Sequence, residues 1–207
     1  MDAAATTIRD DTTERHLRKY ANRNPLQRLA LGRFYDAVAE EIRAQTPRTM
    51  LDFGCGEGFL LDKMAARDVA MHGYTGLDLR ADAIDAARDR WPRADFRVAD
   101  LFEWPEAGRT FDMVLALEVL EHLPSPERFM ARLAELSGST LLLTVPHEPW
   151  FQLANLARGR DLIRLGNHPE HINHWNPKTF ADFVADYADV VSVRSVFPFV
   201  VLTARPR

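Results

Sequence analysis

The chain has 207 residues, of which 46% are hydrophobic and 27% charged, a composition typical of a globular protein and short for two domains. Its formal net charge of −4 and its pI near 6.0 provide no general attraction to nucleic acid or to an anionic membrane. The single cysteine, Cys55, excludes an internal disulfide, and no apolar run approaches the roughly 18 residues of a membrane span. We therefore expect one domain over residues 1–207, in a cytoplasmic protein without a membrane span or a nucleic-acid partner.

Helical patterning dominates the first 45 residues. Residues 14–44 favour helix, with an interruption at Asn24-Pro25, where Asn24 can cap a helix whose first residue is Pro25. We expect this second helix to lie over the sheet or over the mouth of the binding site, because its apolar residues recur at helical spacing: Leu26, Leu29, Ala30, Phe34, Val38 and Ile42. The segment is also basic, which indicates either a solvated helix face or a patch for an anionic substrate, formed by Arg9, Arg15, Arg18, Lys19, Arg23, Arg28 and Arg33.

A glycine-rich turn follows, in the sequence TMLDFGCGEGFL over residues 49–60. A short apolar run ends at Asp52, glycines stand at positions 54, 56 and 58, and an amphipathic segment begins directly afterwards. This order predicts a strand, a tight turn and a helix. Alternating glycines are typical of a backbone that needs conformations closed to other residues and that a ligand approaches closely.

Strand and helix patterns then alternate along the chain. Strands are predicted over residues 74–79, 96–99, 111–117 and 139–145, and helices over residues 81–90 and after Ser125-Pro126. A last helix is predicted to begin at Asn176-Pro177, before a hairpin of residues 190–196 and 199–204. This alternation predicts an α/β fold with a mostly parallel sheet and helices on both faces.

Carboxylates stand where these strands end. Asp78 lies 24 residues after Gly54, Asp100 ends the third strand, and the fourth strand leads into Glu118-Val-Leu-Glu121-His122. With these residues, the chain resembles the class I S-adenosylmethionine-dependent methyltransferases over roughly residues 48 to 145. The resemblance implies a methyltransferase that uses S-adenosylmethionine, with a Rossmann-like sheet of seven strands, the seventh antiparallel.

The resemblance also assigns roles at the strand ends. The turn of Gly54, Gly56 and Gly58 would lie beside the methionine portion of the cofactor, and Asp78 would bind the ribose hydroxyls. The cofactor ammonium would meet Asp52 and the backbone near Leu117, with Glu118 packed beside the cofactor. The adenine would lie among Asp100, the Leu101 N–H, Leu79 and Phe102. A dinucleotide site is disfavoured because the glycines follow the pattern Gly-x-Gly-x-Gly rather than Gly-x-Gly-x-x-Gly.

Residues 146–176 form an insertion between the fifth strand and the last helix. Loops of this length in compact domains are usually functional or disordered, and this one is too rich in apolar side chains for disorder. We expect a lid over the carboxyl ends of the strands, where open α/β sheets bind ligands, with apolar residues Trp150, Phe151, Leu153, Leu156, Leu162, Ile163, Leu165 and Trp175.

Two groups of residues are candidates for the chemistry. On a helical turn, Glu118, Glu121 and His122 would share one face and could hold Mg²⁺ or another divalent ion. The second group is His168-x-x-His171-x-x-His174-Trp175 in the insertion. Together they are similar to the metal-dependent branch that includes ubiquinone-pathway O-methyltransferases and small-RNA 2′-O-methyltransferases. That resemblance implies His171 as a fourth metal ligand; the alternative is a metal-free catalytic or orienting role for His122 and His171.

The sequence thus favours a methyltransferase that acts on a hydroxyl of a small or lipid-like metabolite, since an apolar lid suits an acceptor with hydrophobic surface. RNA 2′-O-methylation is a second interpretation, supported by the histidine spacing and the basic N-terminal segment but opposed by the acidic pI. An N- or C-methyl acceptor also stays open. A non-catalytic cofactor-binding subunit is disfavoured because Asp52, Asp78 and Asp100 are all present.

Overall fold

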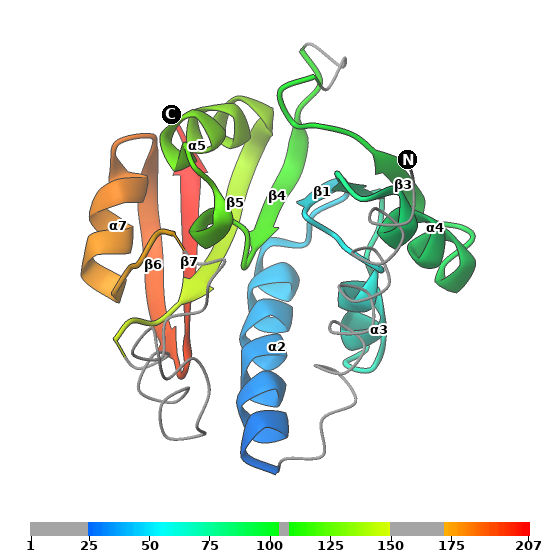
Figure 1. Ribbon diagram of the computed structural model, residues 1–207, viewed down its shortest axis with the longest axis horizontal. Coiled ribbons are helices and arrows are strands. Elements are labelled where there is room, and N and C mark those ends of the chain that lie inside the picture. Colours follow the sequence, from blue (N-terminus) through cyan, green and yellow to red (C-terminus); the bar gives the residue numbers. More distant parts are fainter. Residues whose placement is uncertain (1–24, 104–107, 150–171) are drawn as a thin grey trace, which may run out of the picture.

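A computed structural model describes residues 25–103, 108–149 and 172–207, and these form a seven-stranded sheet with helices on both faces (Figure 1). The strand order is β3-β2-β1-β4-β5-β7-β6. The strands are β1 (Met50–Phe53), β2 (Tyr74–Asp78), β3 (Asp95–Val98), β4 (Phe111–Leu117), β5 (Ser137–Pro146), β6 (Ala188–Val196) and β7 (Phe199–Pro206).

The direction of the strands brings their carboxyl ends to one edge of the sheet. β1 to β5 pair in parallel, while β7 pairs antiparallel with both β5 and β6. β6 therefore runs in the same direction as β5. The turn between β6 and β7 consequently lies at the same edge as the carboxyl ends of β1 to β5, the lower edge in Figure 1. The expected Rossmann-like sheet with an antiparallel seventh strand is confirmed.

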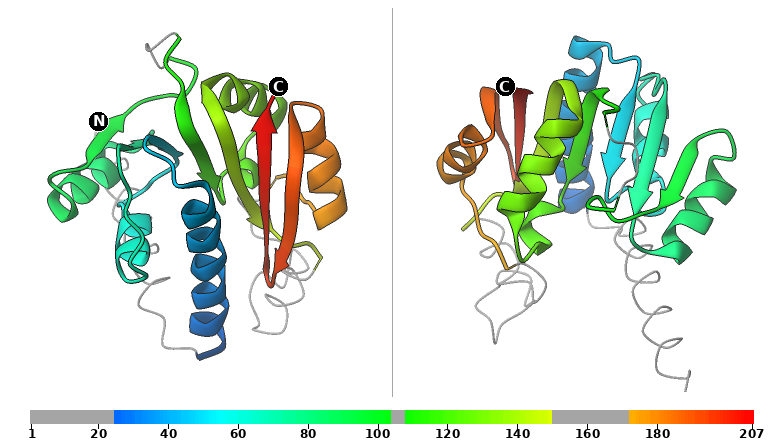
Figure 2. Two further views of the ribbon diagram at one scale, coloured as in Figure 1. Left: turned by 180° about the vertical axis from the view of Figure 1, so that it is seen from behind. Right: turned by 90° about the horizontal axis from the view of Figure 1, so that it is seen from above.

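The two faces of the sheet have separate apolar cores, and different helices cover the two faces (Figure 2). On one face, α2 (Pro25–Gln45), α3 (Phe59–Ala65) and α4 (Ala81–Arg90) pack over strand residues such as Met50 and Met113. On the other, α5 (Pro126–Leu136) and α7 (Pro177–Ala185) pack over residues such as Leu51 and Val114. Adjacent residues of β1 thus enter opposite cores, which is why the central strands are mostly apolar rather than alternating between apolar and polar residues.

Local sequence signals account for several helix boundaries. α2 begins at Pro25 as expected, and α7 begins after a capping box in which Asn176 and Thr179 satisfy each other's backbone N–H groups. Ser125 occupies the N-cap position of α5, but its side chain makes no capping hydrogen bond. The basic residues before Pro25, most of the expected lid and His168 and His171 lie outside the described residues. No helix within the described ranges is both long and apolar enough to cross a membrane.

Candidate functional site

The glycine turn after β1 forms the centre of the carboxyl edge. Gly54, Gly56 and Gly58 all have positive φ, at 77°, 53° and 74°. The N–H groups of Gly54 and Cys55 donate to the Leu77 carbonyl, at 2.8 and 3.0 Å, so the turn crosses over to the end of β2. A Cβ on Gly54 would lie 2.6 Å from a methyl of Val119, whereas a Cβ on Gly56 would meet nothing within 4 Å. The backbone at Gly56 therefore borders open space.

Asp78 faces this turn from the end of β2. Its Oδ2 accepts a hydrogen bond of 2.9 Å from the Gly56 N–H, and its Oδ1 accepts one of 2.9 Å from the Arg80 N–H. Its side chain keeps 14% of its surface exposed. A carboxylate held by two backbone donors has a fixed orientation and retains lone pairs for further donors.

Asp52 lies beneath the turn rather than on its open side. It is 3% exposed, and its Oδ2 accepts a hydrogen bond of 2.7 Å from the Tyr74 hydroxyl. Burial raises the pKa of Asp52 to about 7, and the negative charge of Asp78 adds to the rise. Burial and the same carboxylates raise the pKa of the Cys55 thiol, which agrees with a small side chain tolerated in a tight turn and not with a thiolate nucleophile.

The ends of β2 and β3 expose apolar surface beside a third carboxylate. Leu79 is 65% exposed and Phe102 is 40% exposed, while Asp100 accepts a hydrogen bond of 2.9 Å from the Phe102 N–H. The guanidinium of Arg128 lies 4.2 Å from the Phe102 ring centre. The Leu101 side chain is fully buried in the core, so any contact of Leu101 with a ligand would come from its backbone.

The end of β4 differs from the expected helical turn. Glu118 has φ of 59°, and only Leu120–His122 form a short 3₁₀ helix, η1. The Glu118 N–H donates a hydrogen bond of 3.0 Å to Thr144 Oγ1, and the Thr144 hydroxyl donates one of 3.0 Å to Glu118 Oε1, which ties the Glu118 carboxylate to β5. The prediction that Glu118, Glu121 and His122 share one face of a helix is wrong, because the left-handed conformation of Glu118 interrupts the helix.

The described residues do not form the expected metal centre. Across residues 25–103, 108–149 and 172–207, no three His, Cys, Asp or Glu side chains gather closely enough to hold a metal ion. Glu121 is 1% exposed, and its Oε1 lies 3.7 Å from Nε2 of His122. His171, the expected fourth ligand, lies outside the described residues.

The segment that returns from the insertion is tied to the ends of β4 and β5. The N–H groups of Ile172 and Asn173 donate to the Glu121 carbonyl, at 2.9 and 3.1 Å, and the Asn173 side chain donates to two further carbonyls of residues 120–123. The Glu148 N–H donates to the Trp175 carbonyl at 2.9 Å. These bonds hold the segment of residues 172–175 between η1 and the end of β5.

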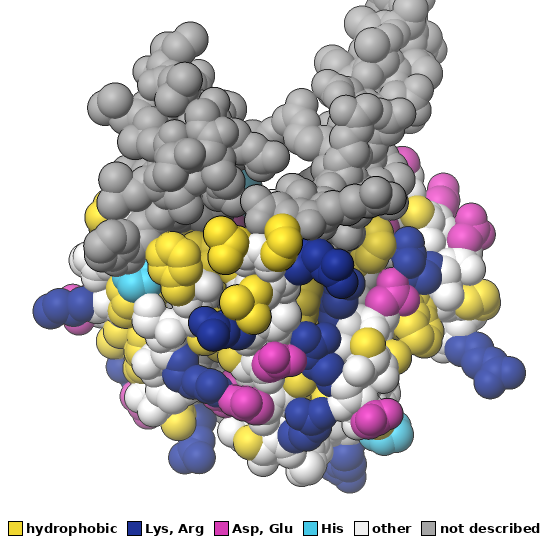
Figure 3. Space-filling model, turned by 90° about the horizontal axis from the view of Figure 1, so that it is seen from below, with side chains coloured by type: hydrophobic (Ala, Val, Ile, Leu, Met, Phe, Trp, Pro, Cys, Tyr) yellow, Lys and Arg dark blue, Asp and Glu magenta, His cyan; other side chains and the backbone are white. Residues whose placement is uncertain are grey.

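This connection brings imidazoles and carboxylates to one stretch of the edge. His174 Nδ1 lies 3.8 Å from Oε1 of the buried Glu148, and His147 Nδ1 shares a hydrogen bond of 2.8 Å with the Ser195 hydroxyl. Burial lowers the pKa of His147, which favours its neutral form. We call His122, His147 and His174, with Glu121 and Glu148, the histidine rim. Hydrophobic side chains gather on this face (Figure 3), and among the exposed residues are Ile172 and Phe197, at 54% and 56%.

Sequence reasoning missed the ion pair between Glu57 and Arg80. Glu57 stands in the glycine turn and is 3% exposed, and its Oε1 accepts a hydrogen bond of 2.9 Å from Nη2 of Arg80. The same guanidinium has its Nε 3.8 Å from Asp78. A charged residue inside a glycine turn was the available signal, since a buried carboxylate needs a cation nearby.

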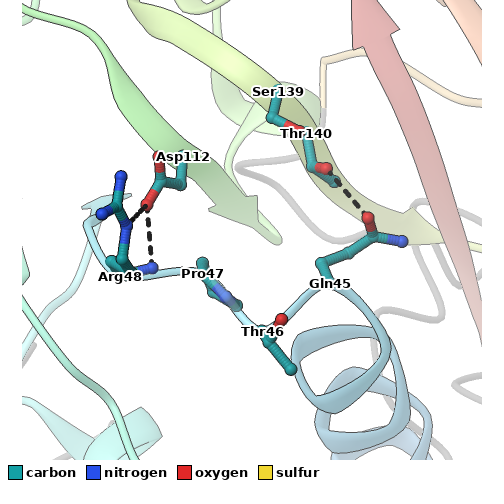
Figure 4. A pocket seen from close by; sticks show the side chains of 7 residues that line it. All are labelled: Gln45, Thr46, Pro47, Arg48, Asp112, Ser139 and Thr140. Atoms are coloured by element: carbon teal, nitrogen blue, oxygen red, sulfur yellow. Dashed lines mark hydrogen bonds and ion pairs between the residues drawn. The ribbon is translucent and has the colours of Figure 1, made fainter.

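A cavity of about 270 Å³ lies at the opposite edge of the sheet and is a poor candidate for the site (Figure 4). It lies beside the end of α2 and the beginning of β4, and polar residues line most of it. The Asp112 carboxylate accepts hydrogen bonds from the N–H groups of Arg48 and Thr49, at 2.8 and 3.1 Å, and so holds this loop in place. The cavity lies at the amino ends of the strands and is therefore separated from every predicted site residue.

The carboxyl edge fits the expected adenosyl cofactor. Open space over Gly56 allows a ligand to approach the backbone, Asp78 offers oriented acceptors to a diol, and Leu79 and Phe102 expose apolar surface near Asp100. These features follow one another along β1, β2 and β3, which are neighbours in the sheet. This is the side of an open α/β sheet on which ligands bind.

Comparison with known proteins identifies the family. A family described as a methyltransferase domain matches residues 15–187. The chain is 29% identical to a ubiquinone biosynthesis O-methyltransferase of Nitrosomonas europaea over 136 residues, which cover 62% of this chain and 57% of that protein. It is 35% identical to 27-O-demethylrifamycin SV methyltransferase of Amycolatopsis mediterranei over 101 residues, which cover 46% and 36%. The chain thus spans about half or less of the length of these curated relatives.

Solved structures share the whole fold. Magnesium protoporphyrin IX methyltransferase from Synechocystis PCC 6803, crystallised with bound S-adenosylhomocysteine, superposes with a TM-score of 0.72 at 20% identity. The match covers 98% of this chain and 100% of that one. The family match over residues 15–187, the sheet order and the glycine turn at its carboxyl edge lead to one conclusion: the chain belongs to the class I S-adenosylmethionine-dependent methyltransferases.

Proposed function

We propose that this methyltransferase methylates a hydroxyl group of a small or lipid-like metabolite. The observation that carries the proposal is the histidine rim, where ionisable imidazoles stand beside exposed Ile172 and Phe197. Imidazoles suit the removal of a hydroxyl proton, and the apolar side chains suit an acceptor with a hydrophobic body. The named O-methyltransferase activity of the Nitrosomonas relative supports the same acceptor atom.

The cofactor would lie along the ends of β1 to β4. The turn of Gly54, Gly56 and Gly58 would lie beside its methionine portion, with open space over Gly56, and the Asp52 carboxyl group lies beneath that turn. Asp78 would bind the ribose, and the adenine would lie among Asp100, Leu101 N–H, Leu79 and Phe102. The backbone at Leu117 and Glu118 would complete the site at the end of β4. When bound, the cofactor supplies an electrophilic methyl group on a sulfonium.

The residues of the chain would then orient the acceptor and accept its proton. His174 is our candidate for the base, because its Nδ1 lies 3.8 Å from the buried Glu148 carboxylate, whose charge would favour a proton on Nδ1 and leave Nε2 as the base. His122 also borders the edge, with 38% of its side chain exposed. His171 stays a candidate from the sequence: His171→Ala is expected to lower turnover far more than cofactor affinity. Alignment of the acceptor with the methyl group can supply much of the acceleration without a strong base.

The proposal includes no divalent ion. The expected ligands Glu118, Glu121 and His122 do not converge, since Glu118 is bonded to Thr144 and only Glu121 and His122 lie together.

Methyl transfer to a defined set of acceptors tests the proposed function. The full chain is incubated with S-adenosylmethionine labelled in its methyl group and with a catechol, a long-chain alcohol, a fatty acid, an alkylamine or a short RNA. We expect label in an alkali-stable ether formed from the catechol or the alcohol. Label confined to an alkali-labile ester, an amine or the RNA would contradict the proposal. Asp78→Asn is the control, and it should abolish every transfer that depends on the cofactor.

A further inference from the structure

We propose that Arg80 is a positioning residue for the cofactor: through Glu57 it ties the turn after β1 to the turn after β2. The spacing between Gly56 and Asp78 then depends on this ion pair. The inference rests on the proposed role of Asp78 in binding the ribose.

The two residues stand at corresponding places in successive strand-to-helix turns. Glu57 precedes Gly58, the N-cap of α3, and Arg80 is the N-cap of α4. The hydrogen bond of 2.9 Å from Arg80 Nη2 to Glu57 Oε1 therefore joins the beginnings of two helices. Because Glu57 is 3% exposed, this cation stabilises its ionised form, and the pair cannot open into solvent without moving the turn.

Asp78 is held by both of the turns that the ion pair joins. The glycine turn donates the Gly56 N–H to one carboxylate oxygen, and the second turn donates the Arg80 N–H to the other. A change in the distance between the turns would therefore break one of these bonds and release the carboxylate. The ion pair would thus affect ligand binding by keeping the Asp78 carboxylate in place.

The local charge explains why a cation belongs here. The carboxylates of Asp52, Glu57 and Asp78 all raise the pKa of Cys55, so all three lie near the base of the turn. Burial lowers the pKa of Arg80, but the hydrogen bond to Glu57 and the charges of Glu57 and Asp78 outweigh burial and raise it. Without the guanidinium, mutual repulsion of the carboxylates would favour separation of the two turns.

A second ion pair between the same helices provides a matched control. Arg90 Nη1 lies 2.8 Å from Asp62 Oδ2, which also joins α4 to α3, but Arg90 is the last residue of α4 and thus far along the chain from the turn. Arg90→Gln therefore removes a link between the same two helices that ends at Phe59 and Asp62 of α3 and not at Glu57 in the glycine turn. If Arg80→Gln raises Kd more than Arg90→Gln does, the difference is due to the link between the two turns.

The test is calorimetric titration of S-adenosylhomocysteine into the wild-type chain and variants, with thermal unfolding recorded for each. Arg80→Gln is expected to raise Kd about 10-fold or more, in line with the loss of a buried charged hydrogen bond, and Arg90→Gln to leave Kd within about twofold. Arg80→Lys should recover most of the affinity, because its ammonium keeps a cation opposite Glu57 on a side chain of nearly the same length.

The variants separate this inference from the proposed function. If Asp78→Asn weakens binding while Arg80→Gln matches Arg90→Gln, the inference is wrong and the ribose role stands. If Asp78→Asn binds as tightly as the wild type, the ribose role fails and the inference fails with it. Should Arg80→Gln not fold, Glu57→Gln decides: a raised Kd supports the link, and a Kd within about twofold of the wild type in folded Glu57→Gln overturns it.

Discussion

The Tyr74 hydroxyl donates a hydrogen bond of 2.7 Å to the carboxylate of Asp52, directly beneath the glycine turn. The two residues lie on neighbouring strands, and both are almost completely buried. Burial raises the pKa of Asp52 from its usual 3.8 to about 7, even though the Tyr74 hydrogen bond opposes the rise. Ionising a carboxyl group that is buried in this way lowers the stability of the fold. Such a group suits a site that receives the cationic ammonium of a ligand.

The first prediction concerns stability and pH. Between about pH 4 and pH 7, folded Asp52 keeps a proton that the unfolded chain has lost, so the free energy of unfolding falls as pH rises through this window. Asp52→Asn removes this dependence and should stabilise the protein at pH 8 by up to about 4 kcal/mol, while weakening cofactor binding. Urea denaturation at pH 5 and pH 8 measures the free energy of unfolding of the wild type and of Asp52→Asn. The variant Asp36→Asn, at an exposed position, is the control. An unchanged pH dependence in Asp52→Asn would contradict the account.

The second prediction separates two glycines of the same turn. Gly54→Ala would place its Cβ 2.6 Å from Val119, so it should destabilise the fold by about 2 kcal/mol or more. Gly56→Ala meets no neighbour and should cost only about 1 to 2 kcal/mol of backbone strain, but its methyl would enter the space for the cofactor. We therefore expect the larger loss of stability in Gly54→Ala and a clear loss of S-adenosylhomocysteine affinity in folded Gly56→Ala. Gly32→Ala, which lies within α2, should be stable and bind normally. Normal affinity in Gly56→Ala would place the cofactor elsewhere.

The third prediction concerns the residue that accepts the proton of the acceptor hydroxyl. With an acceptor found in the transfer assay, His174→Gln should lower kcat about 100-fold, and Glu148→Gln should lower it less, because it disorients the imidazole without removing it. Neither variant should change the affinity for S-adenosylhomocysteine. His72→Gln, an exposed histidine in the loop before β2, is the control. A full kcat in His174→Gln would leave His122 and His171 as the remaining histidine candidates.

The fourth prediction concerns metal removal. Because Glu118 is bonded to Thr144 and does not join Glu121 and His122, we expect turnover to persist after dialysis against EDTA. Addition of Mg²⁺ to the dialysed enzyme should not raise the rate. Loss of turnover in EDTA that Mg²⁺ restores would require a metal site that includes residues outside the described ranges.

Sequence patterns predicted the elements where the signal is local. β4 and α4 have the predicted bounds, and α7 begins at the predicted Asn176-Pro177 cap. β5 begins two residues earlier than expected, at Ser137, because Ser137 pairs with Phe111 of β4, and that pairing depends on the tertiary fold. Strand ends are set by such partners and not by their own residues.

The site was predictable to the extent that its residues stand in strand-end motifs. The glycine turn and the strand-end carboxylates Asp78 and Asp100 lie along one edge, as a parallel sheet requires. The left-handed backbone of Glu118 was not predictable, since Glu rarely adopts it and the pattern of residues 118–122 resembles a helix. The Glu57–Arg80 pair also escaped prediction, because its partners are 23 residues apart and meet only when both turns are folded.

Hydrogen exchange with and without S-adenosylhomocysteine tests most directly whether the carboxyl edge of β1 to β4 binds the cofactor. We expect the ligand to slow exchange in peptides that cover residues 53–58, 78–80, 100–103 and 117–119, and to leave residues 45–48 and 139–140 at the opposite edge unchanged. Slower exchange confined to that opposite edge, or no change anywhere, would contradict the account.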